Sequence, residues 1–232
     1  MLSIRPVEGL PEVRPGDVLA ELIAAAVGPD LEAGDVLVVT QKVVSKAEGR
    51  LVAVDPDDPL AHKALVEAEA VRVLRRRGDL IVTETRHGFV CANAGVDLSN
   101  VERGWAALLP VDADRSARRI RDGLRARIGL EVAVVVSDTF GRPWRRGVTD
   151  VAIGVAGLAG VVDLRGSTDA LGRALQVTEV CIADEVAAAA ELVMGKARGV
   201  PVAVVRGLDA AFFGEGSVHD EIVRPHAEDL FR

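Results

Sequence analysis

The sequence predicts a mixed α/β (α+β) fold, on three observations. Apolar runs typical of strands and amphipathic segments typical of helices are mixed along all 232 residues. Their order is not the regular βαβ repeat of a Rossmann sheet. Hydrophobic residues make up 49% of the chain and charged residues 27%, so a sizeable core and a soluble surface can both form. We expect one domain over residues 1–232, with 110–114 as the seam if it consists of two interlocked subdomains.

Three elements are expected near the N-terminus. Leu2–Val7 begins with apolar–polar alternation and predicts a short strand. Asp17–Val27 has helical spacing, and Asp17 is suited to the N-cap. Asp35–Thr40 is almost entirely apolar, which indicates a strand with both faces covered.

The next stretch predicts a helix and a hairpin. Asp58–Arg77 is expected to be a helix, because it ends in three arginines that suit the helix dipole and is followed by Gly78 as a C-terminal cap. Leu80–Thr85 and Phe89–Ala92 predict the two strands of a hairpin.

The second half alternates again. Asp114–Ile128 and Ala183–Met194 predict helices, each followed by a glycine. Glu131–Val136, Val148–Val155 and Pro201–Arg206 predict strands.

Charge and hydropathy argue against nucleic-acid-binding, secreted and membrane-spanning proteins. The net charge of −7 disfavours a nucleic-acid-binding protein, which needs basic surface to displace counterions. Residues 1–6 lack the apolar core of a secretory signal. The longest mostly apolar stretch, 151–162, is too short to span a bilayer. We therefore expect a cytoplasmic protein with no nucleic-acid or membrane partner.

Two segments in the first half carry polar groups suited to chemistry. Thr40–Lys46 follows a buried strand, and Lys46 could hold a phosphate; the alternative is a loop with two solvated lysines. In Asn93–Asn100, Asp97 lies among amides, whose oxygens suit hard divalent cations. An Asx turn is the alternative there.

Two more segments follow later in the chain. Asp138 stands at the expected end of an apolar strand, as in many enzymes that bind Mg²⁺ for phosphoryl transfer. Positive charge follows it at Arg142, Arg145 and Arg146, although a surface turn with incidental arginines would look the same. Phe213–Ser217 places a carboxylate between two glycines, which suits either a phosphate-binding loop or a plain turn.

Common nucleotide and hydrolase motifs are absent from the sequence. There is no GxxxxGK[ST], so the chain is not a P-loop enzyme, and no GxGxxG follows a strand. No GxSxG nucleophile elbow is present.

Across these segments the sequence resembles the coenzyme F420 γ-glutamyl ligase family. The matches follow the family's order and cover nearly the whole chain. They are VEGLP at Val7–Pro11, VSKAEGR at Val44–Arg50, NAGVDLSN at Asn93–Asn100, SDTFGRPWRRG at Ser137–Gly147, ADE at Ala183–Glu185, and VVRG and GEGS between Val204 and Ser217.

The resemblance implies an enzyme that joins one or more L-glutamates to F420-0 through γ-amide bonds in coenzyme F420 biosynthesis, with GTP converted to GDP and phosphate. It implies Mg²⁺ or Mn²⁺ at two sites, help from K⁺, and an intertwined homodimer of an unusual two-part fold. An acyl phosphate is the simplest way to activate the acceptor carboxylate for amide formation. Some relatives carry a C-terminal flavin reductase-like domain, which we do not expect in this chain.

The family's functional residues carry over by motif. Asp97 and Asp138 are expected to bind metal and, with Arg146, to carry catalysis, while Thr139 and Glu215 join a second cation. Relatives often have Ser where Gln41 stands. The residues expected to hold GTP are Leu10, Pro11, Glu12, Val13, Gln41, Lys46, Asn100, Phe213, Gly214, Gly216, Ser217, Val218, His219 and Asp220.

Two other functions remain open from the sequence. One is a related GTP-dependent amide ligase acting on another acid acceptor. The other is a nucleotide-binding regulator without catalysis, which would not need the carboxylates of Asp97, Asp138 and Glu215.

Overall fold

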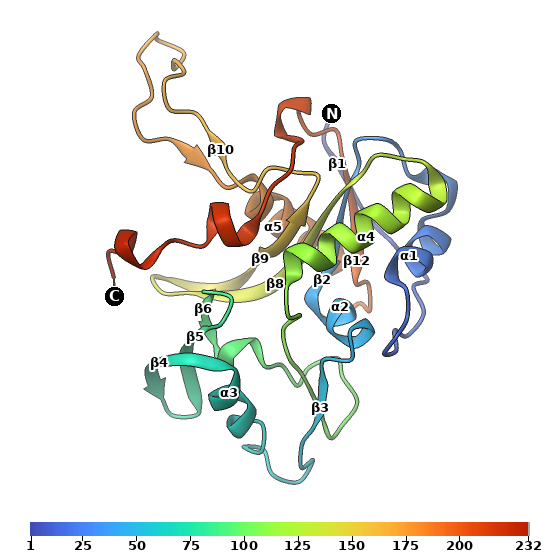
Figure 1. Ribbon diagram of the computed structural model, residues 1–232, viewed down its shortest axis with the longest axis vertical. Helices are drawn as coiled ribbons and strands as arrows, with labels where there is room; N and C mark the ends of the chain where they lie inside the picture. Colours follow the sequence, from blue (N-terminus) through green and yellow to red (C-terminus); the bar gives the residue numbers. More distant parts are fainter. Residues whose placement is uncertain (232) are drawn as a thin grey trace.

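The centre of the molecule is a mixed sheet. The computed structural model describes residues 1–231, and within them the largest sheet has five strands in the order β1-β12-β2-β8-β9 (Figure 1). β2 and β8 run parallel, and the other neighbouring strands are antiparallel. The expected mixed α/β class without a Rossmann sheet is therefore confirmed. The strands are β1 (Ser3–Pro6), β2 (Val36–Thr40), β8 (Ala133–Arg142), β9 (Arg145–Ala156) and β12 (Val202–Arg206).

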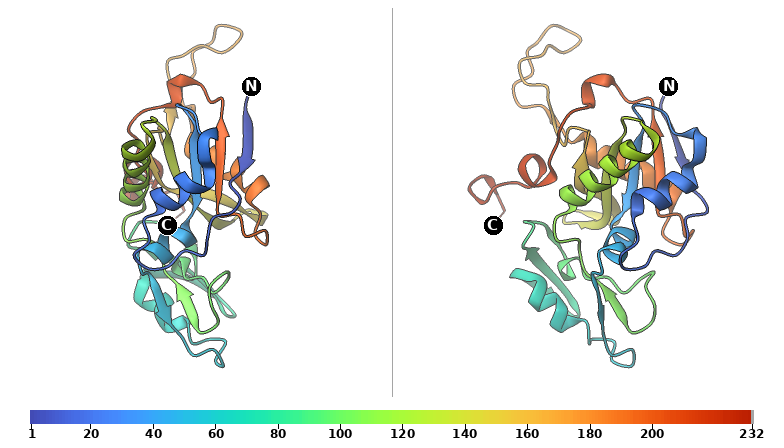
Figure 2. Two further views of the ribbon diagram at one scale, coloured as in Figure 1. Left: turned by 90° about the vertical axis from the view of Figure 1, so that its right-hand side faces the viewer. Right: turned by 45° about the vertical axis from the view of Figure 1, so that its right-hand side comes forward.

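Helices cover both faces of this sheet. α1 (Leu19–Val27) and α4 (Ala113–Ile128) pack on one face, and α5 (Ile182–Met194) packs on the other (Figure 2). Residues of β2 alternate between the two cores, with Leu37 in the first and Val38 in the second. The fully apolar sequence of β2 follows from this burial on both faces.

A smaller part of the chain lies below the sheet in Figure 1 and has its own apolar cluster. Its strands form two small antiparallel sheets, β3 with β7 and β4 with β5 and β6. The cluster contains Val66, Ile81, Ala94, Val96, Ala106 and Leu108. The elements are β3 (Leu51–Ala53), α3 (Lys63–Glu69), β4 (Ala70–Arg77), β5 (Leu80–Thr85), β6 (Val90–Ala92), η2 (Asn93–Gly95) and β7 (Trp105–Ala107). The seam at 110–114 stays a prediction.

The helix expected over Asp58–Arg77 is wrong in its second half. Only α3 is helical, and Ala70–Arg77 forms the strand β4 instead. Pairing with β5 decides this conformation, and Arg72 forms an ion pair with Glu84 across the two strands at 2.9 Å. Tertiary pairing here overrides the helix propensity of alanine, leucine and arginine. Gly78, with φ of +57°, makes the hairpin turn rather than a helix cap.

One expectation at a helix start is wrong, and one alternative at another helix start is excluded. Asp17 is not the N-cap of α1, because the helix begins after Val18. The carboxylate of Asp17 accepts a hydrogen bond from the Arg14 amide instead. The segment after β2 is the helix α2 (Gln41–Ala47) and not a loop. Its residues are mostly good helix formers, and the helix puts Lys42 and Lys46 one turn apart on the same side.

β8 and β9 are longer than their sequence patterns indicate. They form one antiparallel ribbon, so that Ser137, Asp138 and Thr139 lie inside β8 and not after its end. The register shifts between Val136 and Ser137, and such bulges redirect the side chains that follow them. At the tip of the ribbon Trp144 is 83% exposed.

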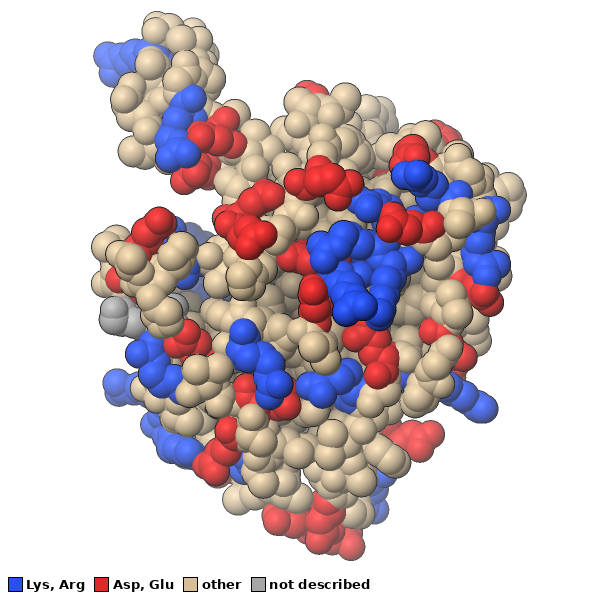
Figure 3. All heavy atoms as spheres, viewed as in Figure 1, with Lys and Arg blue, Asp and Glu red and all other residues tan. Residues whose placement is uncertain are grey.

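An arm between β9 and α5 projects from the body, at the upper left of Figure 1. It contains β10 (Val162–Asp163) and β11 (Glu179–Val180). Basic side chains gather over α4 on the face shown in Figure 3, although the net charge is −7. None of the described helices is long and apolar enough to cross a membrane. The remaining short helical turns are η1 (Gly28–Asp30), η3 (Ala210–Phe212), η4 (Val218–Ile222) and η5 (His226–Glu228).

Candidate active site

A pocket of about 360 Å³ is lined by residues of both the sheet and the smaller part. Many of the residues expected to bind nucleotide or metal line it together. These are Leu10, Pro11, Glu12, Val13, Gln41, Lys46, Asp97, Asn100, Asp138 and Thr139. They come from separate segments of the chain, so the fold, and not sequence proximity, assembles this site.

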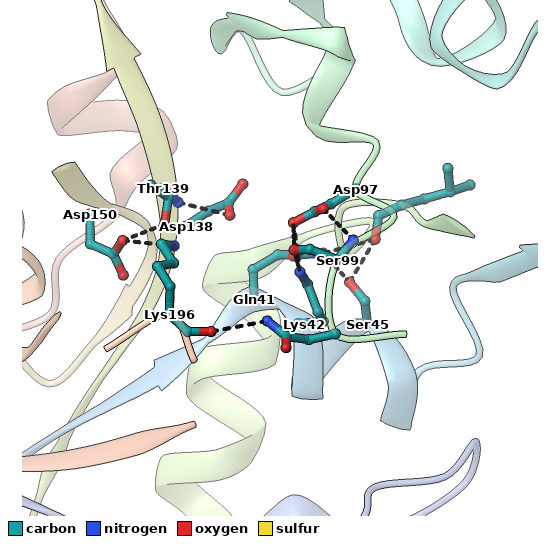
Figure 4. A network of polar contacts seen from close by, with 11 residues as sticks. Gln41, Lys42, Ser45, Asp97, Ser99, Asp138, Thr139, Asp150 and Lys196 are labelled. Atoms are coloured by element: carbon teal, nitrogen blue, oxygen red, sulfur yellow. Dashed lines mark hydrogen bonds and ion pairs between the residues drawn. The ribbon is translucent and has the colours of Figure 1, made fainter. Parts of the chain in front are cut away.

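The helix α2 supplies two lysines to the pocket. The Lys42 ammonium lies 2.6 Å from Asp97 Oδ2 and donates to Ser99 Oγ at 2.8 Å (Figure 4). Lys46 forms an ion pair with Glu12 across the pocket wall. The side chains of both lysines are largely buried, which makes the alternative of two solvated lysines on a loop wrong.

Asp97 is held in its ionised form. Burial alone favours the neutral acid, but hydrogen bonds from Lys42 and Ser99 outweigh it and hold the pKa of Asp97 below its ordinary value. The Ser99 amide donates to Asp97 Oδ1 at 2.7 Å, so the Asx turn considered from the sequence is present as well. The turn does not exclude the functional interpretation, since the same carboxylate lines the pocket.

The pKa of Asp138 is shifted in the opposite direction. The side chain keeps some exposure because it opens to the pocket, but the surrounding protein shields its carboxylate from bulk water. This desolvation raises the pKa of Asp138 to about 7, and the charge of Asp97 adds to the rise. The Thr139 amide donates to Asp138 Oδ1 at 2.8 Å. This hydrogen bond lowers the pKa of Asp138 and offsets the rise only in part. Such a carboxylate is stabilised by a cation that enters the pocket.

Gln41 lines the pocket but is tied to the protein. Its amide nitrogen donates to Ser45 Oγ at 2.6 Å and to the Leu108 carbonyl at 3.0 Å. These bonds fasten α2 to the chain that leaves β7. Both bonds use the amide nitrogen of Gln41, so its amide oxygen is the atom that could contact a nucleotide.

Other expected site residues lie elsewhere in the single chain. Arg146 is exposed on the β8–β9 ribbon. Glu215 forms an ion pair with Arg121 of α4 at 2.6 Å. The segment Phe213–Asp220 is fastened to the first turn of α4 through Asp114. None of these residues is among those that line the pocket.

The pocket residues without a role assigned from the sequence include Lys42, Asp150 and Lys196. Asp150 is the one acidic residue of the strand Arg145–Ala156, and only four lysines occur in the whole sequence. Both were visible signals. The contacts that give these residues a role join strands and helices far apart in sequence, and no spacing rule predicts them.

The donor set of the pocket fits a divalent cation that is shared with a substrate. Across residues 1–231, no three His, Cys, Asp or Glu side chains come close enough together to hold a metal ion by themselves. Asp97, Asp138 and Thr139 nevertheless offer the oxygen donors that Mg²⁺ and Mn²⁺ prefer. Magnesium sites commonly use one or two carboxylates and take the remaining ligands from phosphates and water.

Comparison with known proteins shows the family of this chain. The family model described as F420-0:Gamma-glutamyl ligase matches residues 9–207. The chain belongs to this family. The matched range contains every residue that lines the pocket.

Similarity to individual members of the F420-0:gamma-glutamyl ligase family extends over the full chain. The chain is 44% identical to the coenzyme F420:L-glutamate ligase of Methanothermobacter thermautotrophicus, over 100% of this chain and 99% of that one. It is 45% identical to the protein of the same name from Methanopyrus kandleri, with 100% and 98% covered. For the Archaeoglobus fulgidus protein the identity is 42%, with 100% and 96% covered.

Proposed function

We propose that this protein is an acid–amino-acid ligase that joins L-glutamate to coenzyme F420-0 through a γ-amide bond and cleaves GTP to GDP and phosphate. The observation that carries the proposal is the pocket itself, where Asp97 and Asp138 from different parts of the fold face the same space as Lys42 and Lys46. Family membership and relatives named coenzyme F420:L-glutamate ligase supply the substrate class.

The chemistry requires activation of a carboxylate. Transfer of the γ-phosphoryl group of GTP to the acceptor carboxylate gives an acyl phosphate, and the glutamate amine then attacks its carbonyl and releases phosphate. All three substrates are anionic. Lys42 and Lys46 supply fixed positive charge at the phosphates, and transition-state charge is stabilised by such preorganised groups. Divalent cations held by Asp97 and Asp138 when bound neutralise further phosphate charge.

The lining of the pocket also suits a nucleotide. Leu10, Val13 and Val200 give the pocket apolar lining that suits a planar base, while Lys46 can hold its phosphates. We place GTP in this pocket. A second cation at Thr139 and Glu215, and an effect of K⁺, belong to the same proposal.

Replacing Lys46 by Met is expected to weaken GTP binding by about 10- to 100-fold, since a charge-assisted hydrogen bond contributes roughly 1.5–3 kcal/mol. Methionine keeps most of the length of the side chain and removes the ammonium group with its charge and hydrogen-bond donors. Calorimetric titration with GTP measures the change. Arg103→Met is the control, because Arg103 is exposed and its partners among residues 1–231 are the exposed Asp57 and the Pro56 carbonyl. Equal GTP affinity in Lys46→Met and the original protein would contradict this role.

We further propose that two copies assemble into the family's intertwined homodimer. Large apolar side chains are exposed on the ribbon and on the arm, namely Trp144, Leu171 and Val177. Glu215 lies outside the pocket of its own chain. A second copy would cover such surfaces and could bring its Glu215 to the site.

Complementation tests this assembly. Asp138→Ala and Glu215→Ala are each expected to be inactive alone. Their coexpression should restore about a quarter of the original sites if each site combines Asp138 of one copy with Glu215 of the other, because half of the random pairs are mixed and each has one intact site. No recovery in coexpressed, dimeric protein would overturn the shared site, and a monomeric mass in solution would overturn the dimer.

The reaction is tested directly with the purified protein, GTP, Mn²⁺, L-glutamate and F420-0. Product mass and GDP release are followed together. Mass gain in glutamyl units coupled to GDP is expected, and the final mass shows how many glutamates are added. GDP release without mass gain would indicate a ligase for another acid acceptor. A folded, GTP-binding protein that produced neither would contradict the ligase function and favour a regulator.

A further inference from the structure

Asp150 is a buried carboxylate on the pocket wall with no role in the function described so far. It is 2% exposed and lies on β9, directly opposite Thr139 of β8 in the antiparallel ladder. We infer that Asp150 is a positioning residue that orients the Thr139 hydroxyl as a ligand for a divalent cation. This inference rests on the proposed function only in its use of a cation at Thr139.

The hydrogen bond between the two side chains sets the orientation. Thr139 Oγ1 donates to Asp150 Oδ1 at 2.5 Å (Figure 4). A hydroxyl has one hydrogen and two acceptor lone pairs. With its hydrogen directed at Asp150, Thr139 must present its lone pairs elsewhere, and its side chain lines the pocket. A neutral hydroxyl is a weak cation ligand, and a carboxylate behind it makes the oxygen more basic.

The other contacts of Asp150 hold its carboxylate in place. Ser137 Oγ donates to Oδ2 at 3.1 Å, so both carboxylate oxygens are engaged by hydroxyls of β8. The Lys196 ammonium lies 3.5 Å from Oδ1, and the Lys196 carbonyl accepts from Asn100 Nδ2 at 3.4 Å. A buried carboxylate needs such compensation. Because its oxygens are already used, Asp150 is better placed to orient a ligand than to be one.

A double-mutant cycle separates these two roles. The full-length protein is titrated with Mn²⁺ alone, and free Mn²⁺ is measured by electron paramagnetic resonance. Asp150→Ala is expected to weaken Mn²⁺ binding by about 10- to 100-fold, the usual effect of losing a residue that orients a metal ligand. Thr139→Val should lose the same amount, and the double variant should lose no more than either single one. Asp150→Asn should retain part of the affinity, because its amide oxygen can still accept the hydroxyl.

Thr149→Val is the matched control. Thr149 is next to Asp150 on β9 but is not among the residues that line the pocket, so the same change there should leave Mn²⁺ affinity unchanged. Thermal unfolding shows whether each variant is folded. If Asp150→Ala does not fold, the comparison of Asp150→Asn with and without Thr139→Val gives the same cycle.

Three results would overturn the inference. Additive losses in the double variant would make Asp150 an independent ligand. Unchanged Mn²⁺ affinity in folded Asp150→Ala or in Thr139→Val would remove the link between them. An original protein that bound no Mn²⁺ would overturn the cation site along with the inference, whereas intact coupling without glutamate transfer would contradict only the proposed ligase reaction.

Discussion

Asp138→Asn is expected to lower turnover by roughly a thousandfold or more while leaving the protein at least as stable as the original. Loss of one preorganised electrostatic group costs about 10²–10³ in rate, and a residue that holds a cation at the reacting phosphate should reach the upper end. Stability should not suffer, because the pocket does not solvate the charge of Asp138 well. Burial raises the pKa of this carboxyl to about 7.

The sign of the pH effect follows from that shift. The folded protein holds the Asp138 proton more tightly than the unfolded chain, whose aspartates titrate near pH 4. This group therefore lowers the stability of the original protein as the pH rises from about 4 to about 7. Asn carries no such charge. The advantage of Asp138→Asn in unfolding free energy should grow over this range and then level off.

Denaturant unfolding at several pH values and single-turnover assays measure the two effects. Asp57→Asn serves as the control, since Asp57 is highly exposed and pairs only with an exposed arginine. It should change neither turnover nor the pH dependence of stability. Full turnover in Asp138→Asn would remove this residue from the mechanism, and a large loss of stability above pH 7 would show that its charge is well compensated in the fold.

The central sheet could be predicted from local pattern, and the physical reason is burial. A strand covered on both faces, such as β2, must be apolar at every position, and that pattern is unambiguous in the sequence. The helices α4 and α5 were equally clear, since each buries one side and ends at a glycine. For these strands and helices, the pattern of apolar residues in the segment itself indicates which faces are buried.

β4 shows where local pattern fails. Its sequence, AVRVLRRR, has good helix formers and arginines that suit a helix C-terminus, and only pairing with β5 makes it a strand. The continuation of β8 through Asp138 has a similar cause, because its polar residues are extended by pairing with β9 and not by their own preference. In both cases pairing with the next strand of a hairpin decides the conformation, and not the preference of the segment itself.

The candidate site was predictable in its members and not in its contacts. Short motifs indicated Lys46, Asp97 and Asp138 as candidate functional residues. The resemblance to a family then assigned them to one active site. The ion pair of Lys42 with Asp97 joins residues 55 positions apart, and the contacts of Asp150 depend on strand register. The sequence alone contains no sign of either. The placement of Arg146 and Glu215 outside the pocket of the single chain was equally invisible to motif matching.

Asp114→Ala is expected to lower the unfolding free energy by about 3 kcal/mol and to release the segment 217–219. Asp114 is buried at the first turn of α4, and its carboxylate accepts four hydrogen bonds. They come from the amides of Val155, Val218 and His219 and from the Ser217 hydroxyl, at 2.8 to 3.3 Å. Without the carboxylate, buried amides lose their acceptor, and each such loss costs roughly 1–3 kcal/mol unless water replaces it.

The close approach of α4 to β9 makes replacement by water difficult. Gly154 lies so near the first turn of α4 that a Cβ there would come within 2.3 Å of the Ala113 backbone. Moving α4 away from β9 at this point to admit water is therefore expected to be unfavourable. At roughly 2–4 °C per kcal/mol for a chain of this size, the melting temperature should fall by about 10 °C. If the segment 213–220 holds GTP, as the family resemblance implies, nucleotide affinity should fall with it.

Asp112→Ala separates the helix from the loop. Asp112 is the N-cap of α4 and accepts from the Arg115 amide at 2.8 Å, but it makes no hydrogen bond to the loop. Its loss should cost only about 1 kcal/mol, the usual value of an N-cap. Thermal unfolding compares the two variants. Cleavage by a glutamate-specific protease after Glu215 or Glu221, read by mass, reports release of the segment between them. Equal melting temperatures with an equally protected segment would show that Asp114 only caps the helix. The segment 213–220 would then need another anchor. The next candidate is Glu221, whose carboxylate accepts hydrogen bonds from the amides of Gly160, Val161 and Ser217.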